Sequence, residues 1–223
     1  MTSPHRSLTL LAAAQALLLT NGVTLVAINA LAGYALAPDK RLATLPVVGY
    51  VLGSAASTLP ASLFMRRHGR RAGFMLGACC GMLGGAVGAL AIFLQNFWLL
   101  CGATFCSGIY HAFGQYFRFA AAEVVPAEWK SRAISLTLAG GIIGGFIGPA
   151  VGKVTRDLLA PQYLASYASL IGFALASLAI AASLRFPPAA AEEQHGVGRP
   201  LFEIARQPVF IVAVLAAAIG YGV

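Results

Sequence analysis

Three polar side chains, His111, Gln115 and Arg118, lie in an otherwise apolar stretch of the chain, residues 97–124. Their spacing of four and three residues puts all three on one face of a helix. An imidazole, an amide and a permanent positive charge are groups that bind polar or anionic solutes. A charge inside an apolar span costs about 2.5–3.5 kcal/mol on insertion scales, so such groups face a cavity or a partner. We therefore predict that these residues bind a solute or gate its cavity. Arg118 favours a carboxylate-bearing solute over a cation.

Each of these residues also has a plainer interpretation. Arg118 lies near the end of its stretch, so its side chain could extend to the closer membrane surface and pair with Glu123. His111 could be a hydrogen-bonded packing residue. Asn21 and Asn29, in the first apolar stretch, are further candidates for the cavity. For them, interhelical hydrogen bonds are the alternative.

The elements that carry these residues are long apolar runs. Hydrophobic residues make up 59% of the chain and charged residues 10%, whereas a soluble domain carries about 25% charged residues. Arg6 and Asp39 enclose 32 residues without a charge. A helix needs about 20 apolar residues to cross a bilayer core, where only helices or closed barrels satisfy their backbone. The runs do not alternate apolar with polar residues, so membrane helices are predicted.

We predict six complete spans and the start of a seventh. They are expected at residues 8–36, 44–65, 72–94, 97–124, 133–154, 161–184 and 208–223. Residues 1–185 would form a six-helix transmembrane bundle, 186–207 a cytoplasmic linker, and 208–223 the truncated start of a seventh helix. Because the last run is short for a crossing, we expect the chain to be a fragment of a longer protein.

The charges in the loops predict the orientation of the chain in the membrane. With a cytoplasmic N-terminus, four basic residues fall outside, namely Lys40, Arg41, Lys153 and Arg156. Ten fall inside, namely Arg6, Arg66, Arg67, Arg70, Arg71, Lys130, Arg132, Arg185, Arg199 and Arg206. This asymmetry follows the positive-inside rule and accounts for the net charge of +8 without nucleic-acid binding. The alanine- and arginine-rich composition favours a multi-pass protein of a bacterial inner (plasma) membrane.

The loop after the second predicted span, residues 62–71, reads SLFMRRHGRR. It resembles the signature Gly-x-x-x-Asp-Arg/Lys-x-Gly-Arg/Lys-Arg/Lys of the major facilitator superfamily (MFS) of secondary transporters. The matching positions are Arg67, Gly69, Arg70 and Arg71. Ser62 replaces the first glycine and Arg66 the acidic residue. In the family that acid belongs to a charge network that closes the inward face, so Arg66 changes the network. An ordinary basic cytoplasmic turn is the alternative.

A second resemblance lies in the fifth predicted span. Gly144, Gly148, Pro149 and Gly152 fit the family's Gly-x-x-x-Gly-Pro-x-x-Gly motif, which is often associated with antiporters. Glycines four residues apart let helix backbones approach closely, and a proline promotes a kink. Generic small-residue packing is the alternative. Residues 126–133 also resemble the family's link between spans four and five.

The resemblance implies an all-α, polytopic membrane protein. Its six-helix bundle would consist of two inverted three-helix repeats, followed by the start of a seventh helix. It also implies transport of a small organic solute by alternating access, with a second six-helix half of the same protein as partner. The coupling ion could be a proton or another ion. Only His111 and Glu123 could titrate along the pathway within this chain, so a proton site could also belong to the second half. The alternative function is a non-transporting membrane scaffold or a self-associating half-transporter.

Neither an enzyme nor a cofactor-binding protein is expected. The sequence has no nucleotide-binding loop and no catalytic triad. The four cysteines, Cys79, Cys80, Cys101 and Cys106, lie inside apolar runs without metal-ligand spacing, as buried reduced thiols do.

Overall fold

The computed structural model describes residues 4–184 and, beyond them, residues 186, 207, 209, 212 and 216. The chain divides into two compact units, residues 1–187 and 188–223. All helices whose bounds follow belong to the first unit. The predicted linker and the predicted seventh span lie outside the described residues, apart from these single positions.

The regular elements in the described part of the chain are helices. They are α1 (Pro4–Leu36), α2 (Leu45–Phe93), α3 (Phe97–Gly114), α4 (Phe117–Glu123), α5 (Lys130–Thr155) and α6 (Leu164–Ser183), with short 3₁₀ turns η1 (Lys40–Leu42) and η2 (Ala127–Trp129). Four helical segments of this part are long and apolar enough to cross a membrane: His5–Leu36, Lys40–Phe93, Ala127–Thr155 and Leu164–Ser183. Large apolar side chains such as Phe146 and Ile142 point outward, 80% and 62% exposed. The chain is thus a multi-pass, all-α membrane protein, as the sequence predicts.

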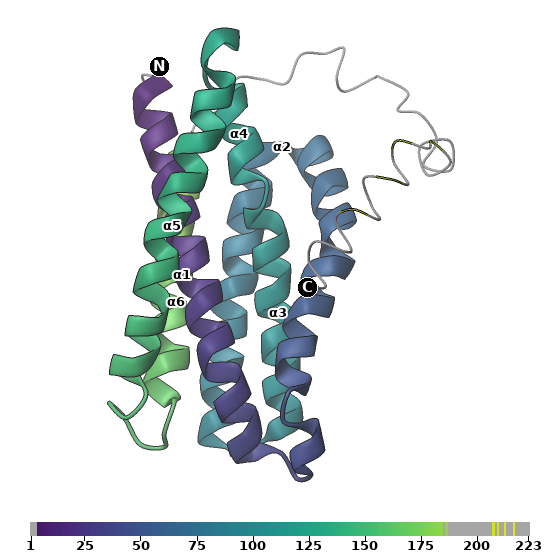
Figure 1. Ribbon diagram of the computed structural model, residues 1–223, viewed down its shortest axis with the longest axis vertical. Helices are drawn as coiled ribbons and strands as arrows, with labels where there is room; N and C mark the ends of the chain where they lie inside the picture. The colour runs from purple at the N-terminus through teal and green to yellow at the C-terminus, as the bar shows by residue number, and fades with distance from the viewer. Residues whose placement is uncertain are drawn as a thin grey trace. The chain divides into compact units, whose positions relative to one another are not determined.

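The predicted second and third spans make up α2, which is two helical arms joined at Gly69. Its backbone leaves the helical conformation at Gly69, which has φ 84° and ψ 161°. Figure 1 shows the two arms running in opposite directions from this point. The prediction of a non-helical loop over residues 66–71 is therefore too wide. One glycine in a conformation that other residues rarely adopt is enough to reverse the chain.

The predicted fourth span is likewise not one helix, because it is divided between α3 and α4. α3 begins at the N-cap Asn96, whose side chain accepts from the Leu99 amide at 3.0 Å. At its end the Tyr116 amide donates to the Phe113 carbonyl, a tighter i→i−3 bond. The Tyr116 hydroxyl donates to the Thr58 carbonyl of α2 at 3.0 Å. This bond holds the break between α3 and α4 against the first arm of α2.

The helices pack in two neighbouring groups joined through α6. α1 packs chiefly against α5 and α6, α2 packs chiefly against α3 and α6, and α4 packs against α5 and α1. Figure 1 shows α1, in purple, running alongside α5. Of the three apolar clusters of buried residues, the larger two lie around Leu11, Phe74 and Phe117 and around Leu25 and Tyr167. The first lies toward the N-terminal end of α1 and the second toward its C-terminal end.

The glycine motif of α5 makes the contact with α1. A Cβ atom at Gly144 would lie 2.7 Å from the Thr20 amide nitrogen, and one at Gly148 would lie 2.8 Å from Val23 Cβ. Such distances are too short for real Cβ atoms, so neither glycine can be replaced without moving a helix. By contrast, a Cβ at Gly145 would meet nothing within 4 Å.

This geometry predicts opposite effects for two neighbouring substitutions. Gly144→Ala should destabilise the protein by about 1–3 kcal/mol, because overpacking pushes α1 and α5 apart. Gly145→Ala should leave stability unchanged or raise it by roughly 0.5–1 kcal/mol, because alanine is the better helix former. The measurement is the thermal unfolding midpoint of each purified variant in detergent. Equal midpoints for the two variants would contradict the close contact.

Candidate functional site

Five buried polar side chains lie at the level between the two larger apolar clusters, each donating a hydrogen bond to a backbone carbonyl. On α1 they follow Leu18 of one cluster and precede Leu25 of the other. The members are Thr20, Asn21 and Thr24 on α1 with Thr104 and Ser107 on α3, each at most 4% exposed. We call these five residues the polar tier. A polar level halfway along a membrane bundle is where secondary transporters hold their substrates.

His111 and Gln115 form a pair at the end of α3, beside the polar tier. Their side-chain nitrogens, His111 Nε2 and Gln115 Nε2, lie 2.7 Å apart. The i, i+4 spacing brings them together, as the sequence predicts. The other ring nitrogen, His111 Nδ1, is buried and has no hydrogen-bond partner among the described residues. Leaving a buried polar atom unpaired costs about 1–3 kcal/mol, so this atom is a candidate contact for a ligand.

Tyr50, on the first arm of α2, completes this group. Its ring centroid lies 5.4 Å from that of His111, with an interplanar angle of 55°. The side chain is 9% exposed. No motif in the sequence points to Tyr50. The signal that could have found it is an isolated tyrosine between Gly49 and Gly53, where small neighbours leave room around an aromatic ring.

Arg118 lies beyond the helix break, on α4. Its guanidinium carbon sits 4.9 Å from the ring centroid of Phe119. Its buried Nε has no hydrogen-bond partner within the described part of the chain. The sequence-based alternative, an ion pair with Glu123, is wrong, because Glu123 binds Arg70 instead. The predicted contact of Arg118 with substrate stays a prediction.

Asn21 and Asn29 contact α6. Asn21 donates to the Leu170 carbonyl at 2.9 Å, and the Tyr167 hydroxyl donates to Asn29 Oδ1 at 2.5 Å. Both asparagines are buried, and Asn29 has no exposed surface. These contacts fit the interhelical packing role that the sequence offered as the alternative. The cavity role predicted for both stays a prediction.

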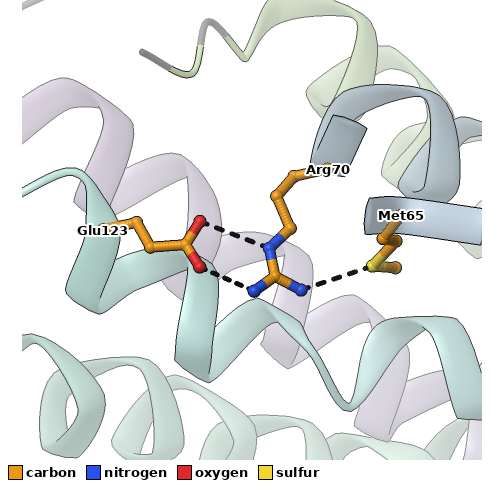
Figure 2. A network of polar contacts seen from close by, with 3 residues as sticks. All are labelled: Met65, Arg70 and Glu123. Atoms are coloured by element: carbon orange, nitrogen blue, oxygen red, sulfur yellow. Dashed lines mark hydrogen bonds and ion pairs between the residues drawn. The ribbon is translucent and has the colours of Figure 1, made fainter. Parts of the chain in front are cut away.

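The basic loop of α2 is tied to α4 by an ion pair. Arg70 Nη2 and Nε donate to Glu123 Oε1 and Oε2 at 2.6 and 3.2 Å. Figure 2 shows the Arg70 guanidinium between this carboxylate and the sulfur of Met65, 3.7 Å from Nη1. The side chains are 27% and 46% exposed, so the pair adds less than about 1 kcal/mol to stability. The pair instead determines which surfaces of α2 and α4 meet.

A second arginine of the loop reaches α6. Arg71 Nη2 donates to the Ala182 carbonyl at 2.7 Å, in the last turn of α6. The last carbonyls of a helix have no partner within the helix, and a cation there also interacts favourably with the negative end of the helix dipole. Arg70 and Arg71 therefore join α2 to α4 and to α6. Both are positions that the sequence motif predicts to act in conformational change, and that role stays a prediction.

Metal binding is not indicated by the described residues. Within them no group of three or more His, Cys, Asp or Glu side chains could hold a metal ion. The chemistry that the arrangement offers is hydrogen bonding and aromatic contact from Tyr50, His111 and Gln115, with one cation nearby on α4.

The fold and the motifs agree with a family comparison. The model of the Major Facilitator Superfamily matches residues 10–223. The chain belongs to this family, as the loop motif predicts. The crystal structure of the E. coli fucose:proton symporter FucP superposes with a TM-score of 0.72 over 96% of this chain and 58% of that chain. The two sequences are 17% identical, so this likeness concerns the fold alone.

Two curated proteins are similar to the chain in sequence. The riboflavin transporter RfnT of Brucella anthropi is 37% identical over 223 residues, which cover 99% of this chain and 56% of that protein. The uncharacterized MFS-type transporter YdeG of Bacillus subtilis is 27% identical over 132 residues, covering 59% of this chain and 31% of that protein. The chain thus spans about half the length of RfnT.

The backbone at Gly69 yields a prediction about the motif loop. A Cβ there would meet nothing within 4 Å, so only the backbone conformation requires glycine. Gly69→Ala should lower stability by about 1–3 kcal/mol, because alanine is strained at this φ and ψ. Gly102→Ala is the matched control, since Gly102 is helical and also has open space at its Cβ position. Thermal unfolding midpoints of both variants check this, and equal midpoints would mean that Gly69 is not strained by a side chain.

Proposed function

We propose that this chain is the N-terminal half of a secondary transporter that moves a small organic solute across the membrane by alternating access. The observation that carries the proposal is the His111–Gln115 pair beside a buried polar tier, in a chain that belongs to the MFS. The second half would be a further six-helix bundle of the same protein. The first bundle would comprise residues 1–185, the linker 186–207 and the start of helix seven 208–223. The proposed activity is transport without chemical conversion.

The solute class that we propose is a planar heterocycle of the riboflavin kind. The support is the 37% identity to a riboflavin transporter over 99% of the chain. The Tyr50 and His111 rings, 5.4 Å apart, offer aromatic surface beside hydrogen-bonding groups. Riboflavin carries no charge at neutral pH, whereas Arg118 by itself favours an anion. The orientation of Arg118 over the Phe119 ring is compatible with a neutral solute.

The transport cycle would use the break in the fourth span. His111 and Gln115 lie on α3 before the break, and Glu123 lies on α4 after it. A solute that hydrogen-bonds to the His111–Gln115 pair would bind next to the Gln115–Tyr116 junction, where the span breaks. Glu123, bound to Arg70, would then gain or lose its partner as the two halves rock about the site. Because Arg66 stands where the family has an acid, Arg70–Glu123 would be the main ionic contact of the loop.

We further propose a bacterial inner-membrane location with the N-terminus in the cytoplasm. The support is the distribution of basic residues between the loops, which follows the positive-inside rule. The Arg70–Glu123 pair would then lie at the cytoplasmic end of the bundle. A proton is a candidate coupling ion, with His111 and Glu123 as its carriers in this half.

The direct test is uptake of riboflavin by vesicles that contain the full-length transporter. His111→Ala and Gln115→Ala should each lower uptake at low substrate concentration roughly tenfold, the effect of losing one hydrogen bond to a buried group. Loss of His111, Gln115 and Arg118 together should abolish it. His5→Ala, a change of an exposed histidine at the start of α1, should leave uptake unchanged.

The same assay separates the two functions that the sequence leaves open. Uptake that survives loss of all three side chains would overturn the proposed site. A full-length protein that neither moves nor binds riboflavin, nor any other solute of a metabolite panel, would favour the membrane scaffold.

The Arg70–Glu123 pair should matter for turnover rather than for folding. Arg70→Glu and Glu123→Arg should each slow uptake at least about fivefold, because each leaves two like charges facing each other. The double variant restores the attraction and should recover most of the rate. Initial uptake rates of the wild type, the two single variants and the double variant form a double-mutant cycle. Glu128→Arg, a change of an exposed acid in the next loop, is the control. A double variant that takes up riboflavin no faster than the single variants would exclude the Arg70–Glu123 pair from the transport cycle.

A further inference from the structure

We propose that Tyr50 and Gly22, together with His111, recognise the hydrogen-bonding edge of a planar heterocyclic solute and so determine its specificity. We call these three residues the Tyr50 subsite. The proposal rests on the transport function proposed above and adds the residues that select the substrate. Tyr50 and Gly22 are not part of the motifs found in the sequence.

The three residues come from three different helices and converge on one point. Gly22 lies on α1, Tyr50 on the first arm of α2, and His111 on α3. A Cβ atom at Gly22 would lie 2.9 Å from the Tyr50 hydroxyl oxygen and 3.7 Å from His111 Nδ1. The phenol and the imidazole thus both direct a polar atom to the face of α1 that has no side chain.

Gly22 differs from Gly108 and Gly144 in what packs against it. At Gly108 and Gly144 the nearest atoms to an added Cβ belong to the backbone of a neighbouring helix. At Gly22 they belong to the polar ends of two side chains, Tyr50 and His111. Close helix packing therefore explains Gly108 and Gly144, whereas at Gly22 the missing side chain lets the Tyr50 hydroxyl and the His111 ring approach α1.

The hydrogen bonds of His111 leave one ring nitrogen unused. Its Nε2 is taken by Gln115 at 2.7 Å. If the Gln115 amide donates there, His111 Nδ1 carries the ring proton and is a donor; with the amide rotated, Nδ1 is an acceptor. In both cases Nδ1 is buried and unpaired among the described residues. A polar atom of a ligand could therefore pair with it.

Two of the other buried tyrosines, Tyr110 and Tyr167, pair their hydroxyls with side chains of the protein. The Tyr110 hydroxyl donates to Ser177 Oγ at 2.7 Å, and the Tyr167 hydroxyl donates to Asn29 Oδ1 at 2.5 Å. The Tyr50 hydroxyl makes no hydrogen bond to any residue that the structure describes. His111 Nδ1 is the buried, unpaired atom of the two, whereas the Tyr50 hydroxyl is not fully buried. Buried polar groups are paired as a rule, so this unpaired nitrogen beside the Tyr50 hydroxyl indicates a ligand position.

The chemistry of the two groups defines the edge that they would recognise. A hydroxyl donates and accepts, and Nδ1 does one or the other, so together they fit an adjacent carbonyl and N–H, as in a lactam or an imide. The aromatic rings of Tyr50 and His111 favour a flat ring beside that edge. The pyrimidinedione edge of a flavin has this pattern. Neither group carries a fixed charge, so a phosphate or carboxylate fits this position less well.

The test compares uptake of riboflavin with uptake of 3-methylriboflavin, in which a methyl group replaces the hydrogen of the edge N–H. Full-length wild-type protein in vesicles should prefer riboflavin. Tyr50→Phe keeps the ring but loses the hydroxyl, so KM for riboflavin should rise roughly tenfold with the maximal rate within about twofold. The preference over the methylated analogue should shrink. Gly22→Ala adds a methyl group that would displace the Tyr50 hydroxyl, so it should raise KM at least as much.

Two matched variants control for packing. Tyr110→Phe removes a hydroxyl bound inside the protein and should lower the unfolding midpoint without changing KM. Gly172→Ala adds a methyl group on α6, where nothing lies within 4 Å, and should leave both unchanged.

Three outcomes of these measurements decide whether the Tyr50 subsite binds the solute. A selective rise in KM with reduced discrimination in Tyr50→Phe supports the subsite. Wild-type kinetics and discrimination in both Tyr50→Phe and Gly22→Ala, with riboflavin uptake intact, overturn the subsite and leave the transport function standing. A wild-type protein that neither takes up nor binds riboflavin overturns the proposed substrate and the subsite together.

Discussion

Direct contact between helix backbones is the constraint on which the rest of this structure depends. In a bilayer an apolar side chain gains little by leaving lipid for another helix, so helices associate through close packing and hydrogen bonds. A Cβ at Gly108 would lie 2.7 Å from the Ser54 amide nitrogen, and one at Gly144 equally close to that of Thr20. These contacts fix α3 against α2 and α5 against α1. The spacing of α1, α2 and α3, and with it the place of Tyr50 beside His111, follows from such contacts.

Close packing also decides which polar groups are satisfied inside the bundle. Thr24 reaches the Gly148 carbonyl at 3.0 Å, and Asn21 reaches Leu170 at 2.9 Å, because their helices lie close enough for short side chains to bridge them. Four buried side-chain atoms of the described residues nevertheless have no hydrogen-bond partner, namely Gln15 Oε1, Asn29 Nδ2, His111 Nδ1 and Arg118 Nε. Of these atoms His111 Nδ1 lies beside Tyr50 and Gly22, and the cost of leaving it unpaired is a physical reason to expect a ligand there.

At the N-terminal end of α1 the bundle is joined by charges instead. Arg70 binds Glu123 on α4, and Arg71 binds the last turn of α6. Both contacts are partly exposed and individually weak, so they can break and reform without unfolding the helices. A strong glycine-packed interior and a weak ionic end are together suited to a protein that changes conformation as rigid bundles.

The sequence by itself determined the helical membrane class, the approximate spans and the family, because hydrophobic length and short motifs are local properties. It also determined the His111–Gln115 pair, since residues at i and i+4 meet on any helix. Only the tertiary structure decided the partner of Glu123, which is Arg70, 53 residues away, rather than Arg118. It likewise placed Asn21 and Asn29 against α6 and brought Tyr50 and Gly22 to His111. Such contacts depend on which sides of the helices pack together. A membrane helix is apolar nearly all round, so its hydrophobic pattern does not encode that choice.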